Sequence, residues 1–222
     1  MPILLSDIFG NPNIGIYGLS NENFAIVPKG MSKSKIKRIS DCLKVNVLET
    51  NLVDSRLIGI FLVANTKGMI LPYIAQENEI EAIKSLSDIN IGVLQDKNTA
   101  LGNMILANDN GAIASSILSN RTIRKISDVL DVEVIKGKIS NLPYVGSMAL
   151  ATNEGVLTHP YIADSEKKII SEVLKVEVTI GTINNGSRFI RSGLIANSKG
   201  AVVGYPTVGK ELMILTRAIK VY

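Results

Sequence analysis

The sequence predicts an α/β fold in which five repeated units close into a ring with pseudo-five-fold symmetry. The first observation is an internal repeat. An apolar residue, a polar turn and a closing glycine recur at 62–68, 106–111, 150–155 and 195–200, with the glycines 43, 44 and 45 residues apart. Gly15 opens a fifth, weaker copy, in which Asn23 lies close to the position of the turn glycine. Units of about 44 residues therefore fill the chain, and we treat residues 1–222 as a single domain.

The second observation is that each unit has the pattern of strand, strand, helix and strand. In the third unit we expect strands at 103–107 and 112–118, joined by a turn whose Asn, Asp and Gly suit a tight hairpin. Ser119 or Asn120 then caps a helix, and a third strand follows at 132–135. The apolar residues of that helix recur at helical spacing: Ile123, Ile126, Val129 and Leu130. The fourth unit repeats the pattern, with Asp164 or Ser165 as the cap and a third strand at 176–180.

The two ends of the chain indicate how the units are arranged. Residues 2–8 have the pattern of a third strand without a unit of their own, and the last unit ends at a helix over 211–219 without a third strand. The simplest arrangement is a closed ring in which the N-terminal strand completes the last unit. Because closure then leaves no free strand edge, we expect a monomer.

Composition excludes several classes of protein. The single Cys42 rules out a disulfide framework and an all-cysteine metal site, and we expect no metal and no cofactor. Four Phe, six Tyr and no Trp argue against a stacking surface for bare bases, and no DNA partner is expected. The first residues lack the pattern of a leader, and no uncharged apolar stretch approaches a membrane span. A cytoplasmic protein without a membrane partner is the expectation.

The positive charge is unevenly distributed. The net charge is +4, and residues 182–222 alone contribute +5, because Glu211 is their only acid. A second basic run lies at 29–44. If the ring closes, the two runs become one continuous basic sector.

Residues 204–211 nearly match a phosphate-binding loop between a strand and a helix. The match fails at Glu211, which replaces the hydroxyl residue that would hold magnesium and would place a carboxylate against the phosphates. A structural turn is therefore favoured here, and a nucleotide-binding regulator remains an alternative that rests on the loop around Lys210.

Five segments resemble the translation initiation factor 6 family in its archaeal form. They are NTALGN at 98–103, LTHP at 157–160, LKVEV at 174–178, GTINNGS at 181–187 and IANSKGAVVG at 195–204. The resemblance covers the full length and implies the pentein fold, a five-bladed α/β propeller. It also implies a protein without catalytic activity, which binds the large ribosomal subunit and keeps the small subunit from joining it, in initiation or in maturation of the large subunit.

The same superfamily includes guanidine-modifying enzymes that use a Cys–His pair with carboxylates, which gives an alternative function. Such an enzyme needs its nucleophile in the central channel. Cys42 lies on the apolar side of the first helix, three units away from His159. We therefore interpret Cys42 as a buried apolar residue and His159 as a structural histidine.

The candidate binding residues follow from the repeat and the resemblance together. Turn asparagines recur at Asn65, Asn108, Asn153 and Asn197, mostly for turn geometry. Asn103 differs, because it follows Gly102 where other units carry isoleucine or serine, and no turn requires an amide there. The resemblance implies that this rim of the propeller contacts a ribosomal protein, with four candidate residues: Asn65, Asn103, Ser147 and Met148.

A second set of candidates is basic. Arg188, Arg191 and Lys199 flank the loop and hairpin of the last unit with no acids nearby in the sequence. Exposed arginine and lysine side chains without partners are suited to phosphates, so these three are candidate contacts to ribosomal RNA.

Overall fold

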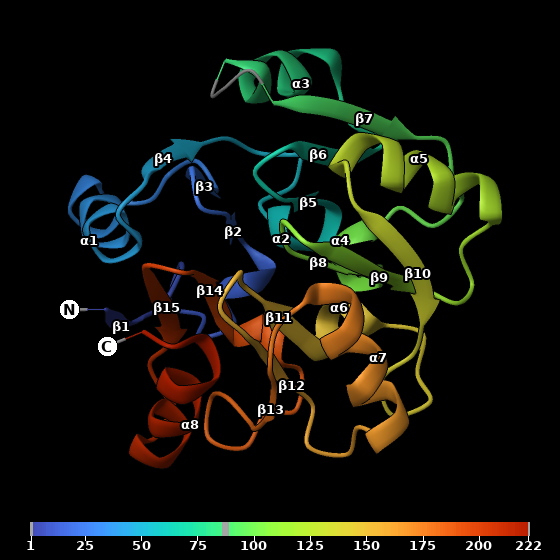
Figure 1. The fold of residues 1–222 in the computed structure, drawn as a ribbon. Helices are drawn as coiled ribbons and strands as arrows, with labels where there is room; N and C mark the ends of the chain where they lie inside the picture. Colours follow the sequence, from blue (N-terminus) through green and yellow to red (C-terminus); the bar gives the residue numbers. More distant parts are fainter. Residues whose placement is uncertain (1, 86–88, 222) are drawn as a thin grey trace.

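The computed structural model describes residues 2–85 and 89–221, and its strands form five three-stranded sheets arranged as blades around one axis (Figure 1). The strands nearest the axis are β2 (Leu19–Ser20), β5 (Val63–Ala64), β8 (Ile105–Ala107), β11 (Ala149–Ala151) and β14 (Leu194–Asn197). The middle strands are β3 (Phe24–Val27), β6 (Gly68–Pro72), β9 (Gly111–Ser115), β12 (Val156–Thr158) and β15 (Gly200–Gly204). The outer strands are β4 (Asn46–Glu49), β7 (Asn90–Leu94), β10 (Glu133–Gly137), β13 (Val178–Ile180) and β1 (Ile3–Ser6).

The helices form two groups at different distances from the axis (Figure 1). Long helices lie on the outside: α1 (Lys33–Leu43), α3 (Glu77–Lys84), α5 (Asn120–Leu130), α7 (Asp164–Leu174) and α8 (Gly209–Ile219). Short helical turns surround the axis: η1 (Ile14–Ile16), α2 (Ile58–Phe61), α4 (Leu101–Met104), α6 (Val145–Met148) and η2 (Ile190–Gly193). Among the described residues, no helix is long and apolar enough to cross a membrane.

Every blade has the same pairing. The inner strand runs antiparallel to the middle strand, and the middle strand runs parallel to the outer strand; in the first four blades the long helix is the crossover between these two. In the last blade, β1 supplies the parallel outer strand, with Ile3 opposite Ala201 and Ser6 opposite Gly204. The first residues of the chain therefore complete the blade built from its last residues.

The pairing corrects one sequence-based expectation. Closure does not remove the strand edges, because the five sheets stay separate and each keeps its outer strand as an edge. Packing covers four of these edges instead: β1 contacts α1, β7 contacts α5, β10 contacts α7 and β13 contacts α8. In these four cases the helix of one blade packs against the outer strand of the preceding blade.

Local sequence explains the ends of the helices. The Oγ of Ser119 accepts a hydrogen bond from the backbone N–H of Thr122, which confirms Ser119 as the cap of α5. The helix of the fourth blade begins at Asp164, so its cap is Ala163, one residue before the two that we expected. At the other end, Asp131 adopts a left-handed conformation with φ 49°, which turns the chain into β10.

The first strand of the third unit is shorter than predicted. The expected strand at 103–107 begins at Ile105, because residues 101–104 form the helical turn α4. The second strand ends at Ser115 rather than at 118. Asn103 therefore belongs to a helical turn and not to a strand.

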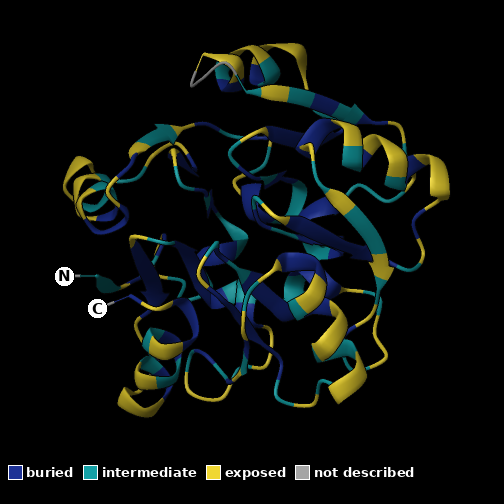
Figure 2. Cartoon of the chain, viewed as in Figure 1, coloured by how far each residue is buried: buried dark blue, intermediate teal, exposed yellow. Residues whose placement is uncertain are grey.

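The apolar core is divided between the blades. Five clusters of buried side chains lie where one blade meets the next, and the third-blade cluster joins Ile70 of β6, Ile105 of β8 and Leu130 of α5. Figure 2 shows buried residues over the inner and middle strands, and exposed residues over the outer helices and turns. Each blade is thus held by its neighbours, which fixes the geometry around the axis.

Candidate functional site

The inner strands connect two rims of the ring. Each inner strand starts at a short helical turn that contains a glycine and ends at a polar hairpin turn. We call the first end the glycine rim, formed by Gly15, Gly59, Gly102, Gly146 and Gly193. We call the other end the asparagine rim, formed by Asn21, Asn65, Asn108, Thr152 and Asn197.

The glycine rim is closed by direct backbone contact. A Cβ atom on Gly102 would overlap the carbonyl oxygen of Gly59, one on Gly59 would overlap that of Gly15, and one on Gly146 would overlap that of Gly102. Side chains are excluded at these positions by close approach of the neighbouring turn. Gly193 differs, because its Cβ would meet the side chain of Asn184.

The asparagine rim is a ring of side-chain hydrogen bonds that runs from blade to blade. The Nδ2 groups of Asn21, Asn65 and Asn108 donate to the carbonyl oxygens of Asn65, Asn108 and Thr152, at 2.7, 3.3 and 3.1 Å. Asn197 Nδ2 donates to the carbonyl of Asn21 at 3.0 Å, which crosses the junction between the last and first blades. The Oδ1 of each asparagine accepts two N–H groups of its own turn, as for Asn108 with Asn110 and Gly111.

Thr152 interrupts the asparagine ring. Its Oγ1 accepts the turn N–H groups of Glu154 and Gly155, but it has no amide that could donate to the next blade. The predicted equivalence of Asn153 with Asn65 is therefore wrong by one residue. In the first blade the turn asparagine is Asn21, and Asn23 lies directly before Phe24, the residue at the position of the turn glycine.

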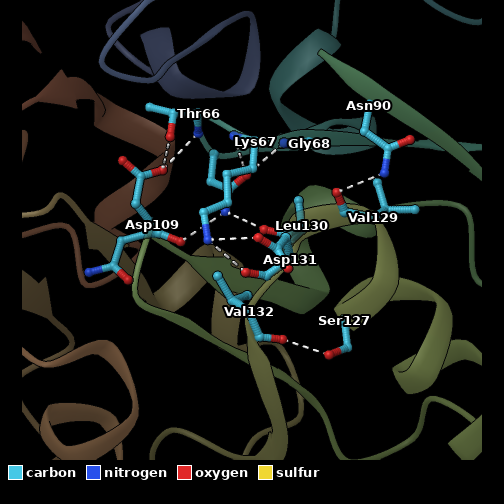
Figure 3. Close-up of polar contacts among 12 residues, drawn as sticks. Thr66, Lys67, Gly68, Asn90, Asp109, Ser127, Val129, Leu130, Asp131 and Val132 are labelled. Carbon is cyan, nitrogen blue, oxygen red and sulfur yellow. Dashed lines mark hydrogen bonds and ion pairs between the residues drawn. The ribbon is translucent and has the colours of Figure 1, made fainter.

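A second layer of contacts surrounds this ring (Figure 3). The N–H and Oγ1 of Thr66 donate to Asp109 Oδ1 at 2.7 and 2.8 Å, and Ser198 makes the same pair of bonds to Glu22. Lys67 Nζ reaches Asp131 at the end of α5 at 3.0 Å, and Asn65 Nδ2 donates to the carbonyl of Leu130 at 2.8 Å. These bonds connect the turn of one blade to the helix of the next.

The four candidate interface residues are not neighbours. Asn65 lies at the asparagine rim, and the other three lie at the glycine rim. Asn65 and Met148 are each 1% exposed, so they cannot act as interface side chains: the amide of Asn65 bonds within the ring, and Met148 packs in the core. Asn103 and Ser147 are partly exposed, each directly after its rim glycine.

The three basic candidates lie in three environments. The guanidinium of Arg188 lies 4.6 Å from the ring centre of Tyr161, at the surface. Lys199 is exposed, and its Nζ donates to the carbonyl of Glu22 at 2.7 Å. Arg191 instead lines the axial channel, where its Nη2 donates to the carbonyl of Leu62 at 3.3 Å. Arg191 stays a predicted contact to ribosomal RNA, but of the three residues it is the least suited to one, because its guanidinium points into the channel.

The basic sector does form where the ring closes. A groove beside β1 is lined by Arg38 and Asp41 of α1 and by Leu212 of α8. The two basic runs thus flank the same strand. Lys35 is already paired there with Asp7, at 2.8 Å.

Cys42 and His159 are not brought together. Cys42 Sγ lies 3.3 Å from the carbonyl oxygen of Ala201, beneath α1, and burial raises the pKa of its thiol. His159 Nδ1 accepts from the backbone N–H of Tyr161 at 3.1 Å, and burial together with Arg188 lowers the pKa of the imidazole. Neither residue lines the channel cavities. A thiolate activated by a nearby imidazole does not exist in this arrangement.

Glu211 explains the loop that resembles a phosphate site. Its carboxylate accepts from the N–H groups of Asn185, Gly186 and Val208 at 2.8–3.0 Å, and from the hydroxyl of Thr182 at 2.6 Å. The carboxylate occupies the space above the first turn of α8 that a phosphate would need. Glu79 and Glu166 bind the corresponding loops of their blades in the same way, each with three backbone N–H groups. The glutamate at this position in three blades therefore holds the start of each helix to the loop before it, and we call it the glutamate clamp. From the sequence, Glu211 was interpreted only as a mismatch to the phosphate-binding motif.

The hydrogen bonds of the glutamate clamp predict that the free energy of unfolding depends on pH. Burial raises the pKa of Glu211, but the hydrogen bonds to its carboxylate outweigh this effect, and the pKa lies below its usual range. Stability from the ionised group is present above the pKa of the unfolded chain and is lost as the pH falls through the folded pKa. We expect Glu211→Gln to destabilise the protein by about 1–3 kcal/mol at pH 7, with a smaller difference from the unsubstituted chain at pH 3. Urea unfolding at both pH values measures this, and an equal difference at both contradicts the clamp.

Comparison with known proteins identifies the family. Residues 3–218 match the model described as the eIF-6 family. The chain belongs to this family. It is 50% identical to translation initiation factor 6 of Nitrosopumilus maritimus over 98% of this chain and 99% of that protein, and 40% identical to that of Staphylothermus marinus over 99% and 98%. The archaeal resemblance seen in the sequence is confirmed, and the family supports a role in translation initiation.

The fold is shared with two solved structures of another function. Dimethylarginine dimethylaminohydrolase from Pseudomonas aeruginosa has a TM-score of 0.52 and 11% identity, over 99% of this chain and 89% of that chain. A second dimethylarginine dimethylaminohydrolase has a TM-score of 0.51 and 12% identity, over 76% and 68%. The predicted pentein fold, a five-bladed α/β propeller, is confirmed by this likeness, which at such identity concerns the fold alone.

Proposed function

We propose that this eIF-6 family member binds the large ribosomal subunit and sterically prevents the small subunit from joining it. The observation that carries the proposal is the family match over residues 3–218, with relatives named translation initiation factors over nearly their full length. We further propose that it acts as a cytoplasmic, non-catalytic monomer. A ring in which every blade is held by two neighbours supports this role, because a rigid binder loses little conformational entropy on docking.

We assign the glycine rim as the docking surface. The only charged residue in its five helical turns is Arg191, which lies in the channel. Two aromatic side chains stand directly before these turns: Tyr144, 49% exposed, and Phe189, 54% exposed. An uncharged centre with exposed aromatic anchors is the anatomy of a protein interface. Arg188, beside Phe189, is then placed at the edge, where a contact to RNA phosphates is compatible with its exposure.

The asparagine rim is less suited to docking. Its central side chains use their donors and acceptors within the ring, as described for Asn65, Asn108 and Asn197. Lys199 and Lys67 at this rim are held by carbonyl groups and by Asp131. Binding here would require these bonds to break.

Sucrose-gradient sedimentation with purified subunits tests the proposal. We expect the protein to travel with the large subunit and to reduce the amount of joined ribosome. Asn103→Arg places a long charged side chain at the uncharged centre and is expected to weaken binding at least about tenfold, which corresponds to 1.4 kcal/mol.

Asn110→Arg is the matched control. Asn110 is exposed at the asparagine rim, and the same substitution there keeps the backbone bond from its N–H to Asn108. Sedimentation and subunit joining should stay unchanged. A protein that remains at the top of the gradient contradicts the proposed function, and equal loss in both variants contradicts the assigned rim.

A further inference from the structure

The axial channel, which is lined by residues of all five blades, contains the positively charged side chain of Arg191. The side chain of Arg191 extends from η2 into a cavity of about 30 Å³. Inner strands from every blade line this cavity, through residues that include Leu19, Val63, Leu106, Leu150 and Ala196. At the glycine rim the neighbouring turns come close enough for their carbonyl groups to exclude a Cβ atom at Gly59, Gly102 and Gly146.

The guanidinium of Arg191 has few hydrogen-bond partners within the protein. Its Nη2 donates to Leu62, and its Nε is buried without a hydrogen-bond acceptor. Within residues 2–85 and 89–221, no carboxylate lies within 4.0 Å of the guanidinium. Two acids, Glu22 and Asp109, line a second small cavity at the asparagine rim. Their carboxylates already accept hydrogen bonds from Ser198 and Thr66.

Arg191 stays charged at neutral pH. Burial lowers its pKa to about 10, which is still well above 7. An Nε–H that is buried without an acceptor is unfavourable, and the partner that best satisfies it on a charged guanidinium is an anion. The described residues do not supply one.

We propose that the cavity beside Arg191 binds one small monovalent anion of the halide class. A volume of about 30 Å³ exceeds the roughly 10–15 Å³ that a single water requires, and it leaves no space for a nucleotide or a sugar phosphate. One negative charge balances the one cation. The inner strands are sheet edges, so their backbone N–H groups on the axial side provide further donors.

The bound anion would connect opposite sides of the ring. Arg191 comes from the fifth blade, and Leu62, which accepts its Nη2, precedes β5 of the second blade. An anion on Nε satisfies the remaining donor and holds the guanidinium in this bridging position. Because it binds the folded ring and not the unfolded chain, it raises stability in proportion to its occupancy.

Bromide diffraction tests the site directly. Crystals of the full chain are grown after refolding in sodium bromide, so that the anion is present while the ring closes, and anomalous data are collected at the bromine edge. We expect an anomalous peak within hydrogen-bond distance of Arg191 Nε. A channel that holds only ordered water overturns the proposal.

Thermal unfolding gives a second, independent test. The protein is refolded and melted in sodium bromide and in sodium gluconate at equal ionic strength, since gluconate is too large for the cavity. We expect a melting temperature several degrees higher in bromide, a difference that Arg191→Met removes and that Arg188→Met, an exposed arginine of the same blade, retains. An equal response of all three proteins overturns the site. If Arg191→Met does not fold, the diffraction experiment alone decides.

Discussion

Gly102→Ala is expected to destabilise the ring by about 3 kcal/mol or more and to reduce the yield of folded protein sharply. The added methyl group would overlap the backbone carbonyl of Gly59. A side chain could rotate away, but backbone in a closed ring cannot move without shifting the next turn as well. The same contact recurs from Gly59 to Gly15 and from Gly146 to Gly102, so a displacement would propagate around the rim.

Gly209→Ala is the matched control for this prediction. Gly209 is the first residue of α8, and a Cβ there has no atom within 4 Å. We expect a change of about 0 to 1 kcal/mol in the stabilising direction, because alanine favours the helix. Urea unfolding of both variants measures the difference. A Gly102→Ala variant as stable as Gly209→Ala would contradict backbone closure of the rim.

Asn108→Ala is expected to cost about 3–5 kcal/mol, although its sequence context is that of an ordinary hairpin turn. Its side chain donates to the carbonyls of Thr152 and Leu174 and accepts from the N–H groups of Asn110 and Gly111. Truncation removes four hydrogen bonds and takes the side-chain partner from the buried N–H of Gly111 and from the carbonyl of Thr152. Asn110→Ala, an exposed neighbour whose amide makes one bond, is expected to change stability by less than about 1 kcal/mol.

Thr152, the residue that interrupts the asparagine ring, allows a substitution in the opposite direction. Thr152→Asn supplies the missing amide between the fourth and fifth blades and is expected to raise stability by about 1 kcal/mol. Differential scanning calorimetry of the three variants ranks them. If Asn108→Ala and Asn110→Ala melt together, the asparagine ring is not the element that joins the blades.

The five blades could be predicted from the repeat, because the contacts between neighbouring blades require particular residues at a fixed spacing. Glycine must recur where neighbouring turns touch, and a turn residue must recur where each hairpin reverses. These requirements are visible without a structure, and so is the orphan strand at the N-terminus, which pairs with β15. The short turns such as α4 were missed because four residues are too few to show helical periodicity.

The site was harder to predict, because side-chain direction depends on convergence of all five blades. Asn65 has the composition of a surface turn, yet five such turns meet at the axis and bury it. The direction of the Arg191 side chain could not be predicted for the same reason. Its place in the sequence, next to a hairpin, gives no indication that it points into the channel. Glu79, Glu166 and Glu211 were detectable as the third residue of each helix, but their main partners lie 25 to 29 residues earlier in the chain.

Hydroxyl-radical footprinting of the protein, free and bound to purified large subunits, tests most directly whether the ring docks through its glycine rim. Tyr144 and Phe189 stand at this rim, and Met213, 73% exposed on α8, serves as the internal control. We predict that binding reduces oxidation of both aromatic residues severalfold and leaves Met213 unchanged. Unchanged oxidation of Tyr144 and Phe189 in the bound protein would contradict docking through this rim.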